Sequence, residues 1–122
     1  MLKTVKIGER SYDMKSSAFT PFKYENDYGR DLLKDLNELN KKNTEISKLK
    51  TEEERNSAWM NEINFIFKMS LQIAYVMICE QDPKFKAYDE WLKELDNAFG
   101  DPTWVQEVME LAMSTFRGRV QN

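Results

Sequence analysis

Residues 59–79 read WMNEINFIFKMSLQIAYVMIC and form the most apolar run in a chain in which 32% of the residues are charged. Apolar side chains recur three and four residues apart, a spacing that predicts a helix, at Trp59, Ile63, Ile66, Phe67, Ile73 and Met77. The same spacing predicts a narrow polar stripe on the other side, made of Asn61, Asn64, Lys68 and Gln72. The stripe stops at Gln72, so we expect other elements to cover the apolar C-terminal part of this helix on every side.

Length and composition predict a single domain spanning residues 1–122, with one hydrophobic core. The net charge of −3 argues against nucleic acid as the main partner, because phosphate binding needs a basic face. The run 65–79 is too short to span a membrane and contains Lys68. The opening MLKTVKIGERSY lacks the apolar segment of a signal peptide. The lone Cys79 has apolar neighbours and is interpreted as an inert buried thiol. These features together predict an intracellular protein.

The chain contains no histidine, which lowers the expectation of catalysis. Histidine is the commonest general base, activates Ser and Cys nucleophiles, and binds most transition metals. Three carboxylates, Asp27, Asp31 and Asp35, are spaced four residues apart, but basic residues are interleaved with them. We interpret them as a solvated helix face and not as a cation site. The sequence therefore predicts a protein that is not an enzyme, with no catalytic residues, metal site or cofactor.

The N-terminal half of the chain predicts a β-hairpin over residues 1–16, because two alternating runs flank a turn at Gly8. A helix is expected over residues 20–42, with Thr20 as its N-cap and Pro21 at its first position. The polar residues 40–50 are expected to form a frayed helix end or a mobile loop.

The long central helix is expected over residues 52–81. Thr51 and Glu54 fit a capping box at its start, and Pro83 disfavours helix at the residue before it. Two further amphipathic helices are expected over residues 87–99 and 102–117. The predicted fold class is mainly α (α+β): an N-terminal β-hairpin followed by a bundle of about four helices, the central one longest.

Aromatic residues and methionine are abundant, with seven Met, seven Phe, five Tyr and three Trp. Most should fill the core, but a small bundle does not have room for every amphipathic face. We therefore predict that some of these residues form a protein-binding groove or an oligomer interface. The candidates on the two C-terminal helices are Tyr88, Trp91, Phe99, Trp104 and Phe116. On the central helix a partner is expected at its N-terminal half, around Trp59, Met60 and Ile63.

Four segments in a fixed order carry a resemblance to a known family: VKIGERSYDMKSSA, TPFKYENDYGRDLLKDL, AYVMICEQDP and YDEWLKELD. The second segment contains Thr20-Pro21 and Tyr28-Gly29-Arg30-Asp31, and the fourth contains Trp91-Leu92. With these segments the chain resembles the tail assembly chaperones of long-tailed phages and prophages of Gram-positive bacteria. The resemblance covers nearly the whole chain and is weakest over residues 40–50.

The resemblance implies a non-enzymatic assembly factor that binds and solubilises the apolar, helical tape measure protein before tail tube subunits polymerise around it. It implies the tape measure protein and the tail tube protein as partners, a location in the host cytoplasm, and absence from the mature virion. A homo-oligomer is also plausible by this analogy. The alternative is a helical adaptor or regulatory protein-binding module of a prophage or bacterium. A third alternative is a small enzyme or DNA-binding module. A DNA-binding module would need a basic recognition helix, and none of the expected helices is basic.

Overall fold

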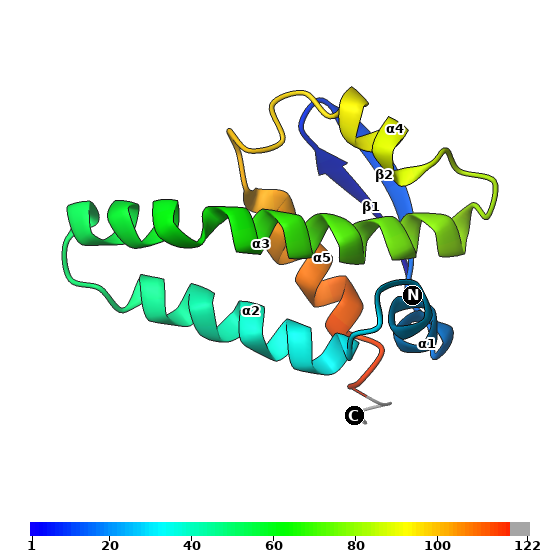
Figure 1. Ribbon diagram of the computed structural model, residues 1–122, viewed down its shortest axis with the longest axis horizontal. Coiled ribbons are helices and arrows are strands. Elements are labelled where there is room, and N and C mark those ends of the chain that lie inside the picture. Colours follow the sequence, from blue (N-terminus) through cyan, green and yellow to red (C-terminus); the bar gives the residue numbers. More distant parts are fainter. Residues whose placement is uncertain (118–122) are drawn as a thin grey trace.

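A 30-residue helix, α3 (Glu52–Gln81), runs through the length of the molecule, and the other elements pack around it (Figure 1). The structure is a computed structural model that describes residues 1–117. In this part of the chain the other elements are β1 (Leu2–Ile7), β2 (Arg10–Lys15), α1 (Phe19–Tyr28), α2 (Leu32–Ser47), α4 (Tyr88–Glu94) and α5 (Thr103–Met113). The predicted fold class, mainly α with an N-terminal hairpin and a long central helix, is confirmed.

The hairpin formed by β1 and β2 packs its inner face on α3 and α5. The strands are antiparallel, with Val5 opposite Tyr12, and the inward side chains Val5, Ile7, Tyr12 and Met14 are buried. Gly8 occupies the first position of the two-residue turn with φ of 68°, the conformation that a type II′ turn requires there. The helices thus supply the packing partner that an isolated hairpin lacks.

The central helix starts where predicted, and it has the predicted polar stripe in its N-terminal part and the predicted apolar C-terminal part. The Thr51 hydroxyl accepts from the Glu54 N–H at 3.0 Å, and the Glu54 carboxylate accepts from the Thr51 N–H at 3.2 Å, which completes the capping box. The polar stripe is exposed up to Lys68. Beyond Gln72 most of the helix is covered: Ile73, Ala74, Val76, Met77 and Ile78 are buried. Tyr75 is half-buried, and so is Cys79, which was expected to be fully buried.

The single helix expected over residues 20–42 is wrong, because the chain forms two helices there. Gly29 ends α1 in a left-handed conformation with φ of 66°, and its N–H bonds the Glu25 carbonyl at 2.7 Å. Asp31 then caps α2, because its side chain accepts from the Lys34 N–H at 3.1 Å. The helix α2 continues to Ser47, so most of the polar segment 40–50 is helical. The expected cap at Thr20 is also wrong: helix α1 begins at Phe19, and the Thr20 hydroxyl donates to Glu80 at 2.6 Å.

The two C-terminal helices are shorter than the expected 87–99 and 102–117. Helix α4 ends at Glu94, and Asn97 adopts a left-handed φ of 62° that a helix does not accommodate. After α5 the Thr115 and Phe116 N–H groups bond carbonyls three residues back. The Thr115 hydroxyl also bonds the Ala112 carbonyl at 2.9 Å, and side-chain bonds of this kind compete with the helical backbone.

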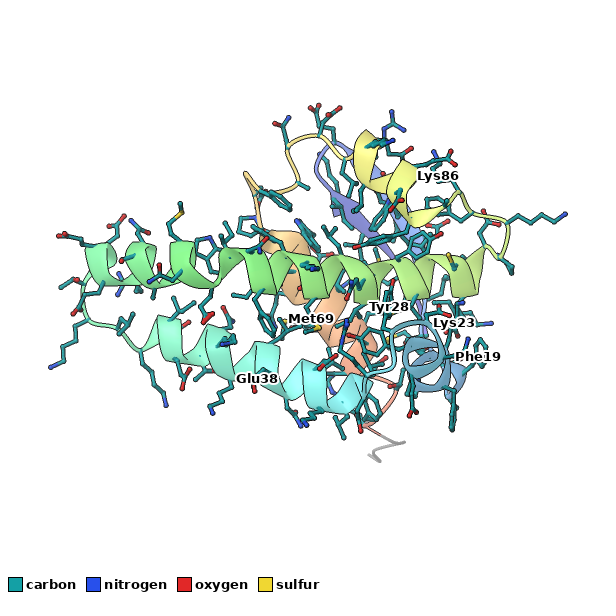
Figure 2. All side chains as sticks on the ribbon, viewed as in Figure 1. Phe19, Lys23, Tyr28, Glu38, Met69 and Lys86 are labelled. Carbon is teal, nitrogen blue, oxygen red and sulfur yellow. The ribbon has the colours of Figure 1, made fainter. Side chains whose placement is uncertain are left out.

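A polar cluster centred on Arg30 joins α1, α2 and α3. Arg30 donates to Asp35 at 3.0 Å, to the Tyr24 hydroxyl at 2.9 Å and to Gln72. Its guanidinium also lies over the ring of Tyr28, which Figure 2 shows close to α3. Asp35 is therefore half-buried and paired, which corrects the expectation that it lies on a solvated helix face.

The apolar character of α3 is accounted for by packing. By length and composition the helix is able to cross a membrane, but 56% of its most apolar window is buried inside the fold. The core helix of a water-soluble protein meets the same criterion.

Candidate functional site: a groove between α3 and α4

An apolar groove of about 530 Å³ lies between α3, α4 and the segment 95–100 that follows α4. Helix α3 lines it with three side chains spaced four residues apart, Ile63, Phe67 and Leu71. These share one face of the helix because residues at i and i+4 lie above one another. The apolar side chains facing them are Tyr88, Leu92, Leu95 and Phe99.

Stacked aromatic rings build one end of the groove. Phe67, which is buried, lies between two rings: its centroid is 4.4 Å from that of Phe99 and 5.7 Å from that of Trp104. Trp59 meets the same ring edge-on at 5.7 Å. Offset stacking of this kind contributes about 0.5–1.5 kcal/mol per pair beyond burial. Phe99 is nevertheless 57% exposed, so one side of its ring remains open for contact.

The tip of the β-hairpin holds the segment that forms this wall. The Asn97 amide donates to the Glu9 carboxylate at 2.6 Å. Gly8 touches the backbone of residue 96 so closely that a Cβ on Gly8 would lie 2.0 Å from the Asp96 carbonyl oxygen. From α5, the buried Trp104 indole N–H donates to the Ala98 carbonyl at 2.8 Å. Contacts on both sides therefore fix the segment 96–98 and with it the position of Phe99.

The structure brings only part of the predicted binding residues to this groove. Tyr88 and Phe99 line it. Met60 is 68% exposed on α3, one turn before Ile63, and is not part of the groove lining. Phe116 is exposed on the turn after α5, outside the groove lining.

Two predicted binding residues are core residues instead, which corrects the expectation that they face a partner. Trp91 is fully buried: Tyr12 of the hairpin packs edge-on against it at 5.7 Å, and Tyr75 of α3 lies at 5.6 Å. Trp104 is 1% exposed beneath Phe67. Both indoles lie on amphipathic faces, but elements distant in sequence cover those faces.

Trp59 lines a second hollow on the other side of α3, where α2, α3 and α5 meet. This hollow has a volume of about 370 Å³, and Ile46, Ile66 and Met109 are among its apolar side chains. The N-terminal half of α3 is therefore flanked by an apolar depression on each side. The partner contact expected near Trp59, Met60 and Ile63 stays a prediction; Met60 is exposed there, and Trp59 and Ile63 are half-buried.

Phe67 and Leu71 belong to the groove, but sequence reasoning assigned them no binding role. The available signal was their spacing from Met60 and Ile63, since residues 60, 63, 67 and 71 fall on one helical face. The same pattern equally predicts a face buried by another helix, so it does not identify a groove.

The lining of the groove is mostly apolar. Among residues 1–117, Lys68 is the only charged residue in the lining, beside the uncharged Asn64 and Asn97. Burial raises the pKa of Tyr88 above its ordinary value. Within residues 1–117 no three His, Cys, Asp or Glu side chains are grouped so as to hold a metal ion.

Comparisons of this chain with known proteins find no matching family model, no matching curated protein and no matching solved structure.

Proposed function

We propose that this protein is an assembly chaperone that holds an apolar helical segment of another protein in the groove between α3 and α4. The observation that carries the proposal is the open apolar groove itself, with Phe99 more than half exposed on its wall. A groove bounded by an apolar helix face fits the helix-in-groove mode of recognition. Among the large apolar side chains of the lining, Phe99 is exposed, and Ile63, Tyr88, Leu92 and Leu95 are half-buried.

The identity of the partner rests on the resemblance to phage tail assembly chaperones. On this proposal the bound segment belongs to the tape measure protein, and the tail tube protein acts next, when its subunits replace the chaperone. The chaperone acts in the host cytoplasm and is absent from the mature virion. No catalytic step, cofactor, nucleic acid or membrane enters the proposed role.

The charge distribution is compatible with this role. The chain carries 18 basic and 21 acidic side chains, while the groove lining contains one charge. A complex that buries the groove would keep its charged exterior in water, which opposes aggregation of an apolar client. A helical adaptor or regulatory module would use the same groove, so the bound partner distinguishes it from a tail chaperone.

Co-expression with a tape measure fragment tests the proposal. Phe99→Glu places a charge on the groove wall, whereas Phe22→Glu makes the same change on α1 at a side chain that is 70% exposed and outside the groove. We expect the native chain and Phe22→Glu to keep the fragment soluble and to co-purify with it, and Phe99→Glu to do neither. Thermal melts of both variants would verify that they are folded. The proposal is wrong if the fragment stays insoluble with the native chain, or if folded Phe99→Glu protects it equally well.

A further inference from the structure

Resting on the proposed function, we infer that the segment bound in the groove is an amphipathic helix of about three turns that carries a carboxylate opposite Lys68. The length follows from α3. The groove lining on this helix runs from Ile63 to Leu71, and the exposed Met60 extends the same face by one turn. At the rise of an α-helix, residues 60–71 span about 16 Å, which corresponds to about three turns of a helix lying alongside.

The spacing of apolar groups along the groove sets the pattern of the partner. Helix α3 and the chain from α4 onward run in opposite directions, since Tyr75 meets Tyr88 at 5.1 Å and Phe67 meets Phe99 at 4.4 Å. The side chains of α3 therefore face those of α4 and its following segment at successive levels. A partner helix with apolar residues at i, i+3 or i+4, and i+7 would place one anchor at each level.

The charge preference follows from Lys68. It is the one charged side chain in the lining, it is exposed, and within residues 1–117 it has no ion-pair or hydrogen-bond partner. The neighbouring Asn64 and Asn97 are uncharged. A carboxylate on the flank of the bound helix would form an ion pair at the groove edge, whereas a lysine there would be repelled. For an exposed pair the difference corresponds to roughly two- to five-fold in affinity.

Binding of synthetic helical peptides to the whole protein tests this inference by fluorescence anisotropy. Two labelled peptides of about 16 residues, long enough for three capped turns, carry leucine at the three anchors and differ only in a glutamate or a lysine on the flank. We expect the native chain to bind the glutamate peptide roughly two- to five-fold more tightly than the lysine peptide. We expect Lys68→Glu to bind the lysine peptide more tightly. Lys34→Glu is the matched control, because it makes the same charge change on α2 outside the groove.

The inference is overturned if neither peptide binds, if Phe99→Glu leaves binding unchanged, or if Lys34→Glu alters the preference as much as Lys68→Glu does. If neither peptide binds while a tape measure fragment is still solubilised and Phe99→Glu abolishes that effect, the inferred length and charge of the partner helix are wrong and the proposed function stands. Peptide binding with the predicted charge reversal, but no effect on a tape measure fragment, would support this inference and count against the tape measure protein as the client.

Discussion

Substituting alanine at Gly8 should destabilise the protein far more than the same substitution at Gly29. Both glycines are left-handed, with φ of 68° and 66°, so each alanine incurs about 1–2 kcal/mol of backbone strain. Their surroundings differ. A Cβ on Gly8 would lie 2.0 Å from the Asp96 carbonyl oxygen and 3.3 Å from the Ala98 nitrogen, whereas one on Gly29 would meet nothing within 4 Å.

The contact at Gly8 involves backbone atoms, so it is relieved only if the hairpin tip and the segment 96–98 move apart. Such overpacking adds about 1–3 kcal/mol. We therefore expect a loss in free energy of unfolding of about 2–5 kcal/mol for Gly8→Ala and about 1–2 kcal/mol for Gly29→Ala. Urea denaturation followed by circular dichroism measures both. Because the segment 95–100 is a wall of the groove, Gly8→Ala should also weaken peptide binding, and Gly29→Ala should not.

Asparagine at the same two positions separates strain from collision. Asparagine tolerates the left-handed conformation but has a Cβ. We expect Gly29→Asn to be nearly neutral and Gly8→Asn to remain strongly destabilising. Equal losses for the two alanine variants, or a neutral Gly8→Asn, would show that the hairpin tip does not press against residues 96–98.

Three further substitutions probe other contacts. The pKa of Glu94 is lowered chiefly because Lys86 donates to it, so its stabilisation is present above the ordinary carboxyl pKa and is lost as the pH falls through the lowered pKa of the folded state. Glu94→Gln should lower the free energy of unfolding by about 1 kcal/mol at neutral pH. In denaturant titrations at acid pH the variant and the native chain should become equally stable. Arg30→Lys keeps the charge but loses the planar stacking and the forked donors of the guanidinium. It should lower the free energy of unfolding by about 1 kcal/mol or more, which corresponds to a fall of a few degrees in the melting temperature. Trp104→Phe leaves the buried Ala98 carbonyl without its donor and should cost about 1–3 kcal/mol in urea unfolding. An unchanged unfolding curve in any of the three would show that the corresponding contact does not stabilise the fold.

The sequence predicted the elements whose signals are local. The capping box at Thr51 and Glu54 and the loss of the polar stripe after Gln72 located α3. The alternation around Gly8 located the hairpin. In each case neighbouring residues supply both the pattern and its physical cause, so no distant contact was needed.

The errors arose where distant contacts decide the outcome. The apolar spacing of Tyr24, Tyr28, Leu32 and Leu36 continues across Gly29, which concealed the break between α1 and α2. Amphipathicity at Trp91 predicted an apolar face but not the ring of Tyr12 that covers it. The groove could not be predicted from the sequence, because its wall depends on the contact between residues near Gly8 and residues near Asp96.

The placement of the three tryptophans gives the protein a built-in optical reporter. Trp91 and Trp104 are enclosed, so their fluorescence should be blue and insensitive to small quenchers. Trp59 is half-buried on the ridge of α3, in ring contact with Phe67 of the groove and lining the hollow on the other side. Red-edge emission and acrylamide quenching should therefore report mainly on Trp59, and an occupant of the hollow that it lines should shift its emission to shorter wavelength without any added label.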